Sequence, residues 1–145
     1  MTIKQPDDLT VDTANVKVSL EWNPAFAAEW NRKFFEAQKW LDNEVLKLNA
    51  KYIPFQTGAL NRSGILGTTL GEGHIVYASP YARYLYYGKV MRDAEGRAFY
   101  GKAPKHTTDE ALHYHGEPQR GKLWFERMKA AHKKQLLKGV AKLMK

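Results

Sequence analysis

One long amphipathic helix pattern limits what this chain can fold into. From Pro24 onward, large apolar side chains recur at spacings of four and three residues over about 27 residues, which is the period of a helix with one buried face. Asn23 is a good N-terminal cap, and proline is tolerated at the first helical position because its N–H would be unpaired there. Burial of the apolar face offsets the entropy lost on ordering the segment, so this face is predicted to form the core. The apolar positions are Phe26, Trp30, Phe34, Ala37, Leu41, Val45 and Leu48.

The segment before this helix divides into two parts. Residues 1–14 are polar and are expected to form a flexible leader. In the stretch from Val16 to Trp22, apolar and polar residues alternate, and this period of two predicts a half-buried strand. Residues 15–145 are therefore expected to form a single domain.

A proline- and glycine-containing stretch follows the long helix. Pro54 is predicted to stop the helix, because the residue before a proline is disfavoured in the α region. Thr57 is predicted to cap a short helical turn that begins at Gly58, with Leu60 facing inward. The next residues suggest a hairpin, with arms at 65–70 and 74–79 and a turn at Gly71-Glu72-Gly73.

The second half begins with Pro80. Tyr81, Tyr84 and Leu85 lie at helical spacing before Gly88, which predicts a short helix with a glycine C-cap. Residues 89–121 are the least regular part, and they are expected to form a long loop excursion with a possible second hairpin around Glu95-Gly96. Such long connections often serve as assembly surfaces. A final helix beginning near Lys122 completes an α+β fold, in which one long N-terminal helix and a C-terminal helix pack on a small antiparallel sheet.

The positive charge is concentrated at the end of the chain. The formal net charge is +8, and the last 24 residues hold eight basic residues and one acid, a net charge of +7. An anionic partner is therefore expected to meet this segment. The candidate DNA-facing residues are Lys129, Lys133, Lys134 and Lys138. A solvated helix face is the commoner meaning of such a run of lysines, and a basic nucleic-acid-binding module is the alternative function.

Few residues suggest catalysis. There is no cysteine, which excludes disulfides and thiolate metal sites, and no apolar run reaches the length of a membrane span. His113 and His115 could share a face and bind zinc, with His106 and Asp109 nearby, but no third ligand is placed. A solvated histidine pair is expected instead, and a small metal-dependent enzyme is the least favoured alternative. We expect no catalytic residue, metal or cofactor, and no membrane contact.

A tyrosine cluster is the best candidate for a contact surface. It comprises Tyr77, Tyr81, Tyr84, Tyr86 and Tyr87, with Arg83 among them. Such side chains can stack on nucleic-acid bases, but they are also concentrated at protein interfaces. Because the basic charge lies elsewhere in the sequence, an interface is favoured for those rings that the core does not use. The candidate assembly residues are Tyr86, Tyr87, Phe99, Tyr100, His113 and His115.

Three segments in a fixed order resemble a phage minor capsid family, which is itself similar to tail-completion and head–tail joining proteins of long-tailed phages. They are IPFQTGALNRSGI, GHIVYASPYARYLYYGK and GKLWFERMKAAH, and they span roughly residues 50–135. The matching positions are Pro54, Thr57, Gly58, Leu60, Tyr77, Pro80, Tyr81, Ala82, Tyr84, Gly88, Trp124, Phe125 and Lys129.

This resemblance implies a structural protein of the virion neck, between the portal-proximal adaptor and the tail tube. It implies partners among the neck, portal-adaptor and tail-tube proteins, with non-specific DNA contact as a possible addition. Members look like monomers before assembly and ring subunits after it, so the host cytoplasm is the expected location before assembly. The family has no catalytic residues to transfer. The strand at Val16–Trp22 and the basic stretch after Lys133 fall outside the family pattern.

Overall fold

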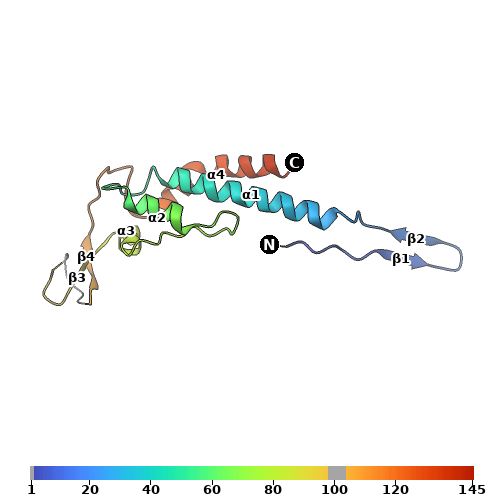
Figure 1. Cartoon of the computed structure of the whole chain (residues 1–145), viewed down its shortest axis with the longest axis horizontal. Coiled ribbons are helices and arrows are strands. Elements are labelled where there is room, and N and C mark those ends of the chain that lie inside the picture. The colour runs from blue at the N-terminus through green and yellow to red at the C-terminus, as the bar shows by residue number, and fades with distance from the viewer. Residues whose placement is uncertain (1, 98–103) are drawn as a thin grey trace.

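Two long helices, packed side by side, form the body of the protein. A computed structural model describes residues 2–97 and 104–145. Helix α1 (Phe26–Asn49) and helix α4 (Trp124–Leu143) run antiparallel along each other (Figure 1). Their interface buries an apolar cluster of Val45, Leu48, Met128 and Leu136. Both helices form where the sequence predicted them. Of the apolar positions predicted as core in α1, Ala37, Val45 and Leu48 are buried, whereas the others are only partly buried. The partly buried positions are Phe26, Trp30, Phe34 and Leu41.

The α1–α4 contact includes a glycine that leaves no room for a side chain. Gly139 of α4 lies against the ring of Trp40 in α1, and a Cβ atom at this position would overlap that ring. The aromatic side chain therefore occupies the space that any other residue at position 139 would need. In this way one glycine sets how closely the C-terminal half of α4 approaches α1.

The ends of α1 differ in detail from the sequence-based expectation. The helix begins at Phe26 after Ala25, and Asn23 Oδ1 accepts the N–H of Ala25 (2.9 Å) without capping the helix. Asn23 and Pro24 thus form a turn before the helix, and not its first residues. Pro54 is also not the immediate stop, because α1 ends at Asn49 and a short turn follows it.

A hairpin was predicted at residues 65–79, and this prediction is wrong. Residues Ala59–Gly67 form helix α2, and the described chain has no strand between residues 68 and 81. The physical reason is a tertiary contact, since Gly64 lies under the ring of Tyr77 and Gly67 lies beside the backbone of Val76. Residues 74–78 therefore pack against a flat helix face and do not pair with a neighbouring strand.

Two small antiparallel sheets complete the α+β fold, which confirms the predicted class. Strand β1 (Leu9–Asp12) pairs with β2 (Lys17–Leu20) and forms a hairpin beyond the N-terminal end of α1 (Figure 1). The strand predicted from the alternation is present, but it is exposed along its whole length and not half-buried. Its partner β1 comes from the polar segment that was expected to be a flexible leader.

The second sheet lies inside the segment predicted as a long excursion. Strand β3 (Lys89–Arg92) follows the short helix α3 (Ala82–Tyr87) and pairs with β4 (His106–Ala111). The pairing contains a register shift between Lys89 and Met91. The turn around Glu95-Gly96 is present, but residues 98–103, where a second arm was expected, lie outside the described residues.

We expect Gly139→Ala to destabilise the protein, although alanine favours a helix over glycine by about 1 kcal/mol. The added methyl group would overlap the Trp40 ring, and overpacking of this kind costs about 1–3 kcal/mol. Urea unfolding of the two proteins measures the difference. The double variant Trp40→Phe/Gly139→Ala has room for the methyl group and should recover part of the loss. A Gly139→Ala protein at least as stable as the parent would contradict the close contact.

Candidate assembly surface

Trp124 is the central buried residue in the packing of α2, α3 and the start of α4. Its buried ring lies edge-to-face against Tyr77 (centroids 5.6 Å apart) and Tyr86 (4.7 Å), an arrangement that aromatic pairs prefer. Ile53 and Leu60 are buried in the same cluster. The start of α4 is thereby packed against α2, α3 and the loop between them.

The Pro54–Leu60 stretch connects α1 to α2, but not by the predicted cap. Leu60 is buried as predicted. Gly58 occupies the N-cap of α2 with φ of 75°, a left-handed conformation that glycine adopts without strain. Thr57 does not cap the helix, since its Oγ1 accepts only a long bond from the N–H of Ala59 (3.4 Å). The exposed ring of Phe55 lies against Gly58.

Helix α3 ends as the sequence predicted. Gly88 is the C-cap with φ of 72°, and its N–H donates to the carbonyl oxygen of Tyr84 (2.8 Å). Within the same stretch Ala82 and Tyr84 are partly buried, whereas Pro80 and Tyr81 are exposed. The motif residues therefore form both a covered inner side and an open outer side of α3.

The loop after β4 is bonded to the backbone of α3. The N–H of Leu112 donates to Gly88 O (3.0 Å), and the N–H of Leu123 donates to Tyr86 O (2.9 Å). Between them, the hydroxyl of Tyr114 donates to Leu85 O (2.7 Å). Burial, with the nearby carboxylate of Glu117, raises the pKa of Tyr114 to about 12, so this hydroxyl remains a donor at neutral pH. These bonds fix the position of α3 on the start of α4.

Arg120 joins the same loop to the end of α1. Its Nη1 atom donates to Ala50 O (2.9 Å) and Ile53 O (2.6 Å), carbonyls left free just beyond the helix. The guanidinium also lies over the ring of Phe55, 5.4 Å from its centroid. Sequence reasoning missed this role, because an arginine within an irregular stretch does not reveal which carbonyls it reaches.

Asp42 holds the loop that follows α2. Its buried carboxylate accepts the N–H groups of Gly71 (2.8 Å) and Gly73 (3.1 Å) at Oδ2 and the side-chain amide of Gln38 (2.7 Å) at Oδ1. The sequence contains a signal for it, since Asp42 follows Leu41 directly and so borders the apolar stripe of α1. A charged side chain in that place is expected to have buried partners.

These contacts shape an open depression beside α3. It has a volume of about 310 Å³ and is lined mainly by aromatic and aliphatic side chains from α3, α4 and the loop before α3. Asn49 lies at its buried edge and donates to the Tyr77 hydroxyl (3.1 Å), while its own Oδ1 has no hydrogen-bond partner. Burial raises the pKa of Tyr77, so its hydroxyl stays neutral. The lining residues are Asn49, Ile75, Tyr77, Ala82, Arg83, Tyr86, Tyr87, Trp124 and Phe125.

The residues predicted to form an assembly surface are only partly brought together. Tyr86 and Tyr87 both line the depression, and the ring of Tyr87 is 59% exposed. Tyr81, at the opposite end of α3, does not line the depression and is 65% exposed. Phe99 and Tyr100 lie outside the described residues.

The histidine pair lies apart from any metal-binding arrangement. His113 and His115 are exposed on either side of Tyr114 in the loop after β4. In the described part of the chain, no three histidine, cysteine, aspartate or glutamate side chains gather closely enough to hold a metal ion. Nothing in the described geometry supports the metal-dependent alternative.

The predicted basic surface is open to solvent. Lys129, Lys133, Lys134 and Lys138 are all exposed on α4, whose apolar stripe faces α1. Lys129 also lies 3.8 Å from the carboxylate of Glu126. The lysines are thus available to an anionic partner. None of the helices described is both long and apolar enough to span a membrane.

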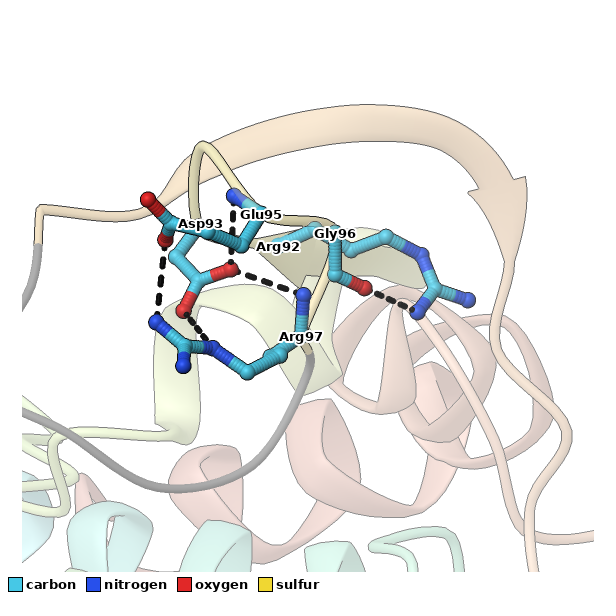
Figure 2. Close-up of polar contacts among 5 residues, drawn as sticks. All are labelled: Arg92, Asp93, Glu95, Gly96 and Arg97. Carbon is cyan, nitrogen blue, oxygen red and sulfur yellow. Dashed lines mark hydrogen bonds and ion pairs between the residues drawn. The ribbon is translucent and has the colours of Figure 1, made fainter.

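A buried carboxylate organises the tip that follows β3 (Figure 2). Asp93 accepts the backbone N–H of Arg97 (2.7 Å) and of Glu95 (3.1 Å), and it also accepts the Nε–H of Arg97 (2.8 Å). These bonds, together with the positive charge of Arg97, hold the pKa of Asp93 below its usual value of 3.8. The turn is therefore set by one ionised side chain.

Together, these features describe a small α+β chain with an open aromatic depression and a basic helix. The comparison with known families gives its class. A model of the minor capsid protein family matches residues 14–144, and the chain belongs to that family. It is a structural protein of a phage virion. No curated protein and no solved structure matches it.

We expect the Asp93 turn to persist at pH values below 3.8 and then to open. Because the folded pKa is depressed, the carboxylate stabilises the turn at pH values above the unfolded value of 3.8, and this contribution is lost as the pH falls through the folded value. NMR titration of the Arg97 amide should show a midpoint below 3.8. Arg97→Gln removes the charge but keeps the backbone bonds, so it should shift the midpoint upward. A parent midpoint at or above 3.8 would contradict this account.

Proposed function

We propose that this phage structural protein acts at the neck of a long-tailed virion, in head–tail joining or tail completion, as a subunit of a ring. The observation that carries the proposal is the aromatic depression beside α3. It is open to solvent, and both Tyr87, which lines it, and Tyr81, which directly precedes α3, are more than half exposed. Exposed aromatic surface of this kind is typical of protein interfaces.

The lining of the depression is mostly aromatic and aliphatic, which suits a protein ligand. The depression also lacks convergent acids or histidines among its lining residues, and its ionisable groups are Arg83 and tyrosines. Such a lining suits recognition better than acid–base chemistry.

The neck is proposed as the site of action because three segments of the sequence resemble neck proteins. The pattern includes Thr57-Gly58, Pro80-Tyr81 and Trp124. Leu60, Tyr77 and Trp124, one residue from each segment, pack in one cluster, and the second and third segments also line the depression. Neck, portal-adaptor and tail-tube proteins are the proposed partners. Copies of the chain are proposed to be monomers before assembly in the host cytoplasm and ring members afterwards.

A nonsense mutation in the phage gene for this chain tests the role. We expect lysates to contain DNA-filled heads and separate tails, because the joint between them is missing. Electron microscopy counts both species, and purified protein added to the lysate should restore infectious particles. The doubly altered Tyr81→Ser/Tyr87→Ser protein should restore far fewer, whereas Lys39→Ser serves as the control, because Lys39 is exposed in the middle of α1 and does not line the depression. Normal tailed virions without the protein would rule out the neck role.

DNA contact by α4 is a second candidate, favoured by the exposure of its four predicted lysines. If they contact phosphates, binding to duplex DNA should weaken steeply with salt, because each contact releases counterions. Filter binding of the Lys133→Gln/Lys134→Gln/Lys138→Gln variant should show a log–log salt slope smaller by roughly three. A slope unchanged by these substitutions would exclude a role for this surface in DNA contact.

A further inference from the structure

The hairpin of β1 and β2 has an apolar face that nothing in the described structure covers. We call residues 2–22, which contain this hairpin, the N-terminal arm. The register places Leu9 opposite Leu20 and Val11 opposite Val18, so these four side chains share one face. Each is more than half exposed. The other face is polar, with Thr10 opposite Ser19 and Asp12 opposite Lys17.

The arm is nevertheless fixed at its base. Asn31 of α1 bonds to both backbone groups of Ile3, accepting its N–H (2.7 Å) and donating to its carbonyl (2.9 Å). The side chain of Gln5 bonds to the backbone at Asn23 (3.1 Å) and Ala27 (3.2 Å). The beginning of the arm is thus bonded to α1 and to the residues just before it, and the other end of the arm leads into α1 along the chain. The hairpin extends from there as a defined projection (Figure 1).

A projecting two-stranded hairpin needs a surface to cover it. Isolated hairpins are marginally stable in water, and a third element against the apolar face is what normally stabilises them. The arm extends past the N-terminal end of α1 and away from the other elements of its own chain (Figure 1). The cover is therefore expected to come from another molecule.

Charge points to α4 of a second copy as that cover. Residues 2–22 hold four acids and two lysines, a side-chain net charge of −2, whereas α4 holds six lysines and arginines and one acid, a net charge of +5. Leu137 of α4 is 59% exposed and lies between Lys134 and Lys138 in the sequence. The net negative charge of the arm therefore complements the lysines that border this apolar side chain.

We propose that the N-terminal arm docks, apolar face inward, on the exposed side of α4 in a second copy of this chain. The arm of one copy then meets a different surface of the next, which makes the contact heterologous and allows a ring to close. This inference deepens the proposed ring and rests on it. It assigns to the arm a contact that the aromatic depression does not provide.

Disulfide trapping tests the contact directly, because the chain contains no cysteine of its own. One preparation carries Val11→Cys and a second carries Leu137→Cys, and the two are mixed at high protein concentration and oxidised. We expect a disulfide-linked heterodimer on a non-reducing gel. The matched control replaces Val11→Cys by Thr10→Cys, which lies on the polar face of the same strand and should give about tenfold less product.

Each other outcome overturns the proposal. A bond only between two Val11→Cys chains would show that arms pair with arms. An intrachain bond in the Val11→Cys/Leu137→Cys double variant would show that the arm folds back on its own α4. Absence of any bond, with circular dichroism confirming folded variants, would exclude the contact. Since the trapping uses purified protein and no phage, its failure leaves the head–tail phenotype as an independent measure of the proposed function.

Discussion

The burial of Trp124 between two tyrosine rings is the contact on which the arrangement of this protein depends. It lies at the first residue of α4, so the direction of that helix and the position of α3 are set by the same ring. The neighbouring N–H of Leu123, in a left-handed conformation with φ of 53°, donates to Tyr86 O (2.9 Å). The aromatic depression exists because these rings meet edge-on and leave their outer sides open.

The irregular segments are held by side chains that bond to backbone groups. Asp42 accepts two N–H groups of the 71–73 loop, and Asp93 accepts two N–H groups of its own turn. Arg120 donates to two carbonyl groups just beyond α1. Backbone groups outside helices and sheets need such partners when water is excluded. Charged side chains make the stronger bonds, so three residues can order long stretches that have little sheet of their own.

The elements that the sequence predicted well are those whose signal is local and periodic. The apolar periodicity of α1 and α4 and the glycine that ends α3 can each be recognised within one segment of the sequence. Each of these elements is present in the structure. The hairpin expected at residues 65–79 failed because its glycines serve a different purpose. Gly64 and Gly67 admit Tyr77 and Val76 against α2, which no local pattern reveals.

The site was predictable to a similar extent. The sequence identified the tyrosines and Leu60, because aromatic clusters and apolar residues after a cap are recognisable. It did not identify Arg120 or the buried oxygen of Asn49, since both depend on segments far apart in the chain. For the arm, alternation predicted a strand but could not tell which surface would cover it, so the exposed face of β2 came only from the structure.

The arm and the depression are both uncovered surfaces of this chain. The arm and the depression lie toward opposite ends of the molecule, with the α1–α4 core between them (Figure 1). Neither contributes a buried residue to the clusters formed by Val45, Leu48, Met128 and Leu136, so the core can form before either surface is occupied. A chain whose core is formed while the arm and the depression stay uncovered can exist alone before it binds a neighbour, as the proposed assembly requires. The heterologous contact proposed for the arm gives a closed ring where its rotation closes.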